Sequence, residues 1–177
     1  NKIINIENSI DTLEFSSEIK EVSKNKIIEY KKSIGLSEKN KIALYCGSLY
    51  KEKRIKFLLR SANLLYQKDP NFRLIIIGSG PDAFLIKKYI RDKNFIIYLG
   101  PIFNEEKIIN FAISDIFLNP GLTGLGILDA FSAGLPFITM SDSLHSPEIY
   151  YLKNGFNGYI VKNGMDGYVK TCLNILN

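Results

Sequence analysis

From Lys41 to the end of the chain, short apolar runs alternate with segments whose apolar residues recur at helical spacing. Six runs have the composition of β-strands: "KIALYCG", "FRLIIIG", "FIIYLG", "DIFLNP", "PFITM" and "NGFNGYIV". Repeated strand–helix units joined by short loops fold into a parallel sheet with helices on both faces. The sequence therefore predicts an α/β fold, a doubly wound, Rossmann-like parallel sheet of about six strands. The strand "FRLIIIG" is expected to be buried on both faces.

The segments between these strands carry the start and stop signals of helices. The first of these helices has one apolar face, made of Ile55, Leu58, Leu59, Ala62 and Leu65. The others are predicted over 82–92, 104–114, 126–134, 146–152 and 166–176. Asn104 and Ser146 are expected N-caps, and Pro147 would then occupy the first helical position. Gly134 is expected to end the helix over 126–134.

The segment before Lys41 does not show the alternation of strands and helices. Residues 24–33 have the pattern of an amphipathic helix, whereas residues 1–23 are expected to be a linker with a small strand, "KIINI", at its start. The chain opens at "NKIINIENSIDT" without an initiator Met, so we expect it to be a piece of a longer polypeptide. No apolar run approaches the ~20 residues of a membrane span, and the opening stretch does not read as a signal peptide.

The charge and the cysteine and histidine content limit which ligands, metals and macromolecules the chain is expected to bind. The formal net charge is +5, with Lys and Arg spread along the chain, which suits a small anionic ligand or an acidic membrane surface better than nucleic acid. Cys46 and Cys172 lack metal-binding or redox spacing and are expected to be free thiols in a reducing compartment. With His145 as the single histidine, a His-based metal centre or a Ser/His/Asp triad is not expected.

Ligands of such sheets bind beyond the carboxyl ends of the strands, where two early loops draw attention. In "GSLYKEKR" (47–54), Lys51, Lys53 and Arg54 stand before a helix N-terminus, which fits a phosphate site and a solvated basic loop equally well. "GSGPDA" (78–83) matches a dinucleotide fingerprint, but no ribose-binding acid follows about 20 residues later. Pro81 also removes one amide. A tight strand-to-helix turn is the preferred interpretation.

Two later loops qualify as well. In "NPGLTGLGILDAFSAGLPFIT" (119–139), glycines leave backbone exposed and Asp129 falls in the first turn of a helix. Asp129 could simply complement the helix dipole, which would not explain the glycines. In "HSPEIYYLKNGFNG" (145–158), Glu148 reads as another dipole partner and His145 as a loop residue.

Taken in order, these loops resemble the carboxyl-terminal, donor-binding domain of the retaining, nucleotide-sugar-dependent glycosyltransferases of family four, which have the GT-B fold. "INIENSIDT" resembles the family's "NG-hydrophobic-D" segment between domains, and "GSLYKEKR" its "GRL…KG" loop. "PGLTGLGILDAFSAGLPFIT" resembles the "PS…EGFGL…LEAMA.G.PV" signature, and "NGFNGYIV" the "G.NG.LV" turn. Residues 24–177 would then form a nucleotide-sugar-binding domain, without the amino-terminal acceptor domain.

The resemblance implies a role for particular residues. Lys53 takes the place of the catalytic lysine that meets the diphosphate, together with Gly47 and Ser48, and Asp129 takes the place of the ribose-binding glutamate. The donor sugar would lie along Gly121, Leu122, Thr123, Gly124 and Leu125, and Gly78 and Glu148 would have secondary roles. Two positions depart from the pattern, since Gly121 replaces the first glutamate of the family's pair and Ser48 replaces an arginine.

The resemblance also implies the activity. A sugar would pass from a UDP- or GDP-linked donor to a glycan or lipid-linked acceptor, without a cofactor or a metal, and the isolated chain would be inactive. The full-length protein is expected in the cytoplasm, where peripheral association with the inner face of the membrane is a further option. Two alternatives stay open: a non-catalytic nucleotide-sugar-binding domain, and a nicotinamide-dependent domain built on "GSGPDA".

Overall fold

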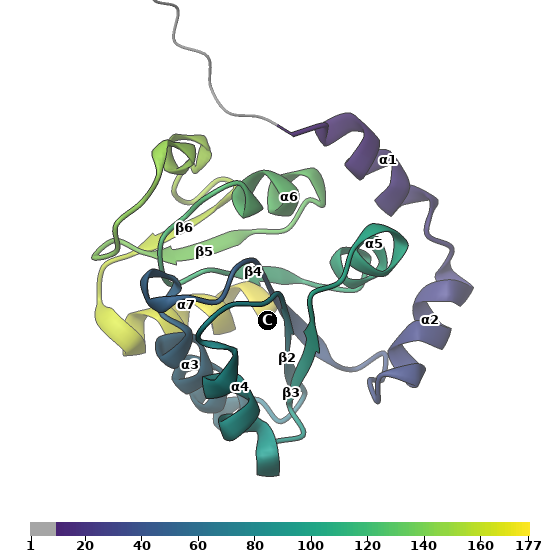
Figure 1. Cartoon of the computed structure of the whole chain (residues 1–177), viewed down its shortest axis with the longest axis horizontal. Helices are drawn as coiled ribbons and strands as arrows, with labels where there is room; N and C mark the ends of the chain where they lie inside the picture. Colours follow the sequence, from purple (N-terminus) through teal and green to yellow (C-terminus); the bar gives the residue numbers. More distant parts are fainter. Residues whose placement is uncertain (1–9) are drawn as a thin grey trace, which may run out of the picture.

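The computed structural model describes residues 10–177, which fold around one six-stranded parallel sheet with the order β3-β2-β1-β4-β5-β6 (Figure 1). The strands are β1 (Lys41–Cys46), β2 (Phe72–Ile77), β3 (Ile96–Gly100), β4 (Ile116–Leu118), β5 (Phe137–Met140) and β6 (Gly158–Val161). Every neighbouring pair is parallel. The predicted fold class is therefore confirmed. The order reverses between β1 and β4, which is where such sheets bind ligands.

Helices cover both faces of the sheet. One face carries α3 (Ile55–Lys68), α4 (Ala83–Tyr89) and α7 (Gly164–Leu176), and the other carries α5 (Asn104–Ala112) and α6 (Gly126–Ser132). Outside α5 lie α1 (Thr12–Glu21) and α2 (Lys24–Ser33), along one side of the molecule (Figure 1). Three short 3-10 helices complete the fold: η1 (Lys51–Lys53), η2 (Ile90–Asp92) and η3 (Pro147–Tyr151).

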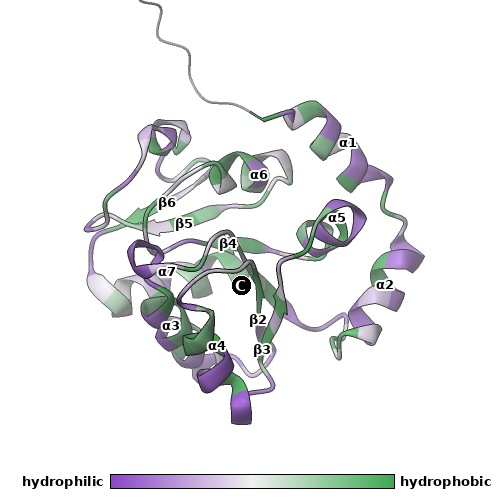
Figure 2. Ribbon diagram, viewed as in Figure 1, coloured by the Kyte–Doolittle hydropathy of each residue, from purple (hydrophilic) through white to green (hydrophobic). Residues whose placement is uncertain are grey.

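The apolar core consists of two layers separated by the sheet. In β2, Leu74 and Ile76 pack with the α3 side, whereas Ile75 and Ile77 pack with the α5 and α6 side. The prediction that this strand is buried on both faces is thus confirmed. Figure 2 shows the apolar strands in the centre, with hydrophilic residues gathered on the outer faces of the helices.

The helix ends partly match the sequence signals. Gly134 has a φ of +70° and follows Ala133, the C-cap of α6, as expected of a glycine that ends a helix. Ser146 is an N-cap with Pro147 after it, but the segment is the 3-10 helix η3. The prediction of Asn104 as an N-cap is wrong: Phe103 holds that place, and Asn104 has a φ of 51°. Asn tolerates this left-handed region better than most residues.

The segment ahead of β1 contains one more helix than the sequence indicated. The predicted helix over 24–33 is confirmed as α2, but part of the presumed linker forms α1. Asp11 caps α1, since its side chain accepts a 3.0 Å hydrogen bond from the amide of Glu14. The predicted strand "KIINI" lies outside the described residues. The helix predicted over 82–92 is divided into α4 and η2, and the last helix begins at Gly164.

Candidate functional site

Two neighbouring pockets lie at the carboxyl edge of the sheet, where the loops after the strands meet. The inner pocket has a volume of about 220 Å³ and is lined by Tyr45, Cys46, Gly47, Ser48, Tyr50, Lys53, Phe117, Asn119, Gly124, Leu125, Gly126, Ile127 and Phe137. The outer pocket has a volume of about 260 Å³ and is lined by Cys46, Gly47, Ser48, Ile77, Gly78, Ser79, Pro101, Ile102, Phe103 and Lys107. Because residues 46–48 line both pockets, they form the wall between the inner and the outer pocket.

Lys53, at the end of η1, is the cation of the inner pocket. Its Nζ donates a 2.6 Å hydrogen bond to the carbonyl oxygen of Leu122 and lies 5.7 Å from the centroid of the Tyr50 ring. Burial lowers the pKa of Lys53, and the negative charge of Glu148 acts in the opposite direction. A partly desolvated ammonium interacts more strongly with an anion than one in water. Lys53 therefore lies where it would meet an anion bound in the inner pocket.

Gly121 is a glycine because another loop passes directly against it. A Cβ atom at this position would lie 2.3 Å from the carbonyl oxygen of Glu52 and 2.4 Å from the carbonyl carbon of Lys53. The amide of Leu122 also donates a 2.8 Å hydrogen bond to that Glu52 oxygen. Loops 47–54 and 119–125 thus touch through their backbones. Because a side chain would collide with this backbone, position 121 requires glycine.

Thr123 and His145 join the loop after β4 to the loop after β5. His145 lies with its Nε2 2.9 Å from the carbonyl oxygen of Met140 and its Nδ1 2.9 Å from the hydroxyl of Thr123. A carbonyl only accepts, so Nε2 carries the proton, and in the neutral ring Nδ1 accepts from Thr123. The carbonyl of Thr123 accepts a 3.3 Å hydrogen bond from the amide of Ser146. His145 is a loop residue, as predicted, and it holds the two loops together.

The basic group predicted in loop 47–54 does not act as one unit. Arg54 is turned away to Asp142, with hydrogen bonds of 2.7 and 3.2 Å between guanidinium and carboxylate. This contact holds the pKa of Asp142 below its usual range. Lys51 is exposed and does not line the inner pocket. Of the three predicted cations, Lys53 alone lines the inner pocket.

The loop "GSGPDA" is a tight turn that packs beneath loop 47–54. A Cβ at Gly78 would lie 1.9 Å from the carbonyl oxygen of Gly47, and one at Gly80 would lie 2.3 Å from that of Leu49. The amide of Leu49 donates a 2.9 Å hydrogen bond to the carbonyl of Ser79. The glycines therefore permit contact between two loops of the protein, which favours the turn interpretation over a dinucleotide fingerprint.

Asp129 lies in the first turn of α6, as predicted, but it belongs to an ion pair. Nζ of Lys107, on α5, donates a 2.9 Å hydrogen bond to Oδ2 of Asp129. The side chains are 26% and 17% exposed, respectively. The Lys107 ammonium also lies 4.9 Å from the ring centroid of Phe15 and 5.6 Å from that of Phe111. Lys107 is thus a partner of Asp129 beyond the two expected from the sequence, a helix dipole and a ribose.

The sequence profile of the family described as "Glycosyl transferases group 1" matches residues 26–177. The chain belongs to this family. The alpha-monoglucosyldiacylglycerol synthase of Acholeplasma laidlawii is 33% identical in an alignment over 131 residues that covers 71% of this chain and 33% of the synthase. The chain thus spans about a third of the length of this relative.

Solved glycosyltransferase structures share the GT-B fold of this domain. A Staphylococcus aureus TarM variant in complex with fondaparinux, alpha-GlcNAc-glycerol and UDP superposes with a TM-score of 0.70 at 19% identity, over 81% of this chain and 30% of TarM. Anabaena HepE in complex with UDP and glucose gives a TM-score of 0.67 at 19% identity, over 88% of this chain and 42% of HepE. At these identities the likeness concerns the fold alone.

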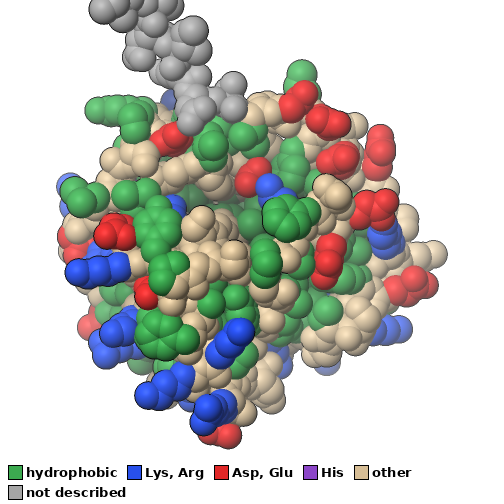
Figure 3. Space-filling view, viewed as in Figure 1, with side chains coloured by type: hydrophobic (Ala, Val, Ile, Leu, Met, Phe, Trp, Pro, Cys, Tyr) green, Lys and Arg blue, Asp and Glu red, His purple; other side chains and the backbone are tan. Residues whose placement is uncertain are grey.

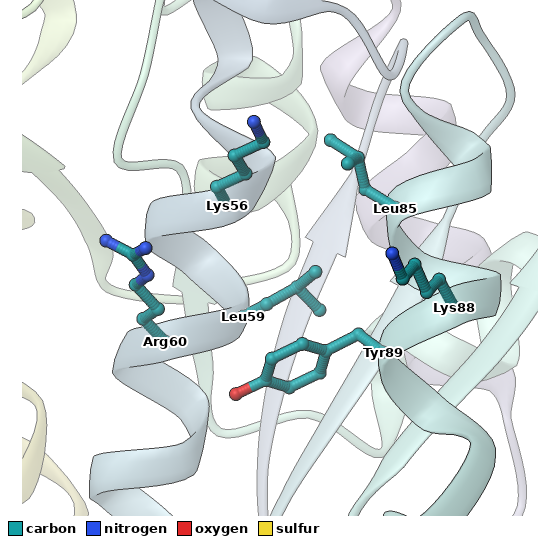
Figure 4. Close-up of a pocket in the computed structure, with 6 residues that line it drawn as sticks. All are labelled: Lys56, Leu59, Arg60, Leu85, Lys88 and Tyr89. Atoms are coloured by element: carbon teal, nitrogen blue, oxygen red, sulfur yellow. The ribbon is translucent and has the colours of Figure 1, made fainter.

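A further groove of this glycosyltransferase domain lies away from the two pockets. It has a volume of about 390 Å³ and separates α3 from α4, with Lys56 and Arg60 on one side and Lys88 and Tyr89 on the other (Figure 4). Figure 3 shows Lys and Arg side chains gathered over this region and acidic ones over α1 and α2. The groove shares no lining residue with either pocket, so it is separate from the candidate site.

The two cysteines of this glycosyltransferase domain are free, as predicted. Burial raises the pKa of the Cys46 thiol to about 12 and raises that of Cys172 further. Both thiols are protonated at neutral pH, so Cys46 is a neutral wall residue of the two pockets rather than a nucleophile. Among residues 10–177, no helix is long and apolar enough to cross a membrane.

Proposed function

We propose that the full-length protein is a retaining glycosyltransferase and that this chain is its donor-binding part, which holds a UDP- or GDP-linked sugar. The observation that carries the proposal is the half-buried ammonium of Lys53 in a pocket with glycine-rich walls. The outer pocket lies directly beside it. Two adjoining pockets, with Lys53 in the inner one and Lys107 in the outer one, suit an elongated ligand that has an anionic centre and a flat end.

In this proposal the diphosphate lies in the inner pocket between Lys53 and the backbone of Gly47 and Ser48. Negative charge develops on the diphosphate as the bond to the sugar breaks. A preorganised cation in a partly dry pocket stabilises such charge without reorganisation, which lowers the barrier. Lys53 is the catalytic residue of the proposal, and no metal takes part. Retention would follow if the acceptor attacks the sugar from the face that the diphosphate leaves.

The nucleoside would extend into the outer pocket. Pro101, Ile102 and Phe103 offer an apolar wall for the base beside Gly78, and the ribose would lie towards Asp129, which takes the place of the family's ribose-binding glutamate. The sugar would lie along the backbone of residues 121–125. Glu148, which is buried and close enough to act on Lys53, would border the sugar from the loop after β5.

The acceptor would bind to a further domain across the cleft. The Acholeplasma relative is named as a synthase of a glucosylated diacylglycerol, and TarM was solved with a sugar-glycerol compound and UDP. These names support a glycan or lipid-linked acceptor, and we place the transfer in the cytoplasm or at the inner face of the membrane. Transfer assays with the full-length protein and both acceptor classes, followed by cell fractionation, test this part of the proposal.

Replacing Lys53 tests the diphosphate site. Lys53→Ala removes a hydrogen bond donor that is charged, so we expect UDP to bind about 10- to 150-fold more weakly. Uridine has no phosphates, and its binding should not change. Lys51→Ala is the matched control, because Lys51 is on the same 3-10 helix but is exposed and outside the inner pocket. Isothermal titration gives all the affinities. An equal loss for UDP and uridine would mean that Lys53 acts through the fold.

A second candidate function is a nucleotide-sugar-binding domain without transfer activity. It is favoured by Gly121, where the backbone of loop 47–54 leaves no room for the family's glutamate. Turnover of a UDP- or GDP-sugar by the full-length protein separates the two functions, because a pure binding domain would release no nucleoside diphosphate.

A further inference from the structure

The two residues of the Lys107–Asp129 ion pair differ in their access to the candidate site. In the described part of the chain, Lys107 lines the outer pocket, whereas Asp129 lines neither the inner nor the outer pocket. Asp129 is also the less exposed of the two, at 17% against 26%. A ligand that enters the outer pocket therefore meets the ammonium before it meets the carboxylate.

Lys107 is held in one position by three neighbours. Oδ2 of Asp129 accepts its hydrogen bond at 2.9 Å, and the rings of Phe15 and Phe111 lie 4.9 and 5.6 Å from its Nζ. A free lysine loses much side-chain entropy when it binds a ligand. Because these contacts already order Lys107 in the protein, less of that entropy is lost on binding, as in other preorganised sites.

The donors and acceptors of the pair fit a hydroxyl. An ammonium has three N–H donors, and Asp129 uses one of them, so others remain for a ligand in the outer pocket. A ribose hydroxyl oxygen accepts such a bond. Asp129 is one methylene shorter than the glutamate in the family pattern, and Lys107, on α5 at the same face of the sheet, lies within hydrogen-bond distance of its carboxylate.

From these observations we infer that Lys107 makes the direct contact with the ribose hydroxyls, and that Asp129 is a positioning residue which holds Lys107 in place. The inference rests on the proposed function, since it assigns the ribose end of the same site. It makes Lys107 a specificity-determining residue for ribonucleotides, a role with no counterpart in the motif resemblance. An ammonium donates to the hydroxyls, whereas a carboxylate would accept from them.

The test compares UDP with 2′,3′-dideoxy-UDP, which lacks both hydroxyls, by titration calorimetry on this chain. We expect the wild type to prefer UDP by about 10- to 150-fold, as for a hydrogen bond to a charged group. Lys107→Met keeps the aliphatic stem against Phe15 and Phe111 but removes the donors, so the preference should fall below about 3-fold. Lys88→Met, in the groove between α3 and α4, is the matched control and should keep the full preference.

A direct contact from Asp129 gives the opposite result. Lys107→Met would then free the carboxylate, and the preference for UDP would stay or rise, which overturns the inference while the proposed function stands. Equal binding of both nucleotides to the wild type also overturns it. Failure of the wild type to bind either UDP or GDP contradicts the proposed function itself, and if GDP alone binds, GDP and its dideoxy form take the place of the UDP pair in this test. Protection of Lys107 from reductive methylation, by UDP but not by the dideoxy form, gives the same answer without a variant; equal protection by both nucleotides overturns the inference.

Discussion

At the scale of single residues, Gly121 shows how one backbone contact constrains the site. A Cβ added at Gly121 would lie 2.3 Å from the backbone of Glu52, whereas one at Gly124 would lie 3.8 Å from Nζ of Lys53, an ordinary distance. We expect Gly121→Ala to lower the free energy of unfolding by about 2 kcal/mol, because one of two packed backbones must move. Gly124→Ala should change it by less than about 0.5 kcal/mol. Urea unfolding of both variants measures the difference, and equal stabilities would contradict the contact.

Some residues of the candidate site can be predicted from the sequence, and others cannot. Lys53 was predicted from its place in a motif, and the structure brings it to a pocket. Lys107 carried no such signal, because its partner Asp129 lies 22 positions away on another helix. Likewise, the contact of Arg54 with Asp142 joins residues 88 positions apart. Which charged side chains pair depends on the tertiary fold, and neither the spacing of residues in the sequence nor their type predicts it. A basic loop is therefore predictable, but which of its cations faces the ligand is not.

At the scale of elements, the inner strands β1, β2, β4 and β5 were predictable because each is an apolar run buried between the two helical layers, and the partly buried edge strands β3 and β6 are apolar runs as well. The helix α1 was missed for a physical reason. It has no residue that is fully buried, and its apolar residues Phe15 and Ile19 gain a partner only when the second layer of the core has formed. Phe15 meets Phe111 edge to face with the ring centroids 5.2 Å apart. Local pattern alone does not indicate that contact.

The docking of α1 can be tested through Phe15. Phe15→Ala removes the ring that packs on Phe111 and Lys107, and because the ring is only half-buried we expect a loss of about 1–2 kcal/mol, below the usual range for a core phenylalanine. Leu13→Ala on the same helix is the matched control, since Leu13 is 83% exposed. Hydrogen exchange should become faster across α1 in the Phe15 variant and stay slow in β1 and β2. Unchanged exchange in α1 would show that Phe15 does not hold the helix.

At the scale of the whole molecule, one sheet joins everything that the candidate site needs. The two pockets are lined by the loops after four strands, β1 to β4, and each of these strands has neighbours on both sides in the same sheet, except β3 at the edge. The two layers of the core share these strands, so neither layer can be lost alone. The strands that carry the pocket loops are therefore held by both core layers, while α1 and α2 pack on the outside of the domain (Figure 1).

This architecture predicts that the 177-residue chain unfolds as one unit, binds nucleotide and transfers no sugar. Because the sheet and both core layers are complete, far-UV circular dichroism and tyrosine fluorescence should report one coincident thermal transition. UDP at about 100 times its dissociation constant should add roughly 2.7 kcal/mol, which raises the melting temperature by about 5–10 °C for a domain of this size. Transfer from UDP- or GDP-sugars should be undetectable, because in the proposed enzyme the acceptor binds to another domain. Product formed by the isolated chain would contradict the proposal that the acceptor binds to another domain. A melting temperature that does not change when nucleotide is added would contradict the donor site.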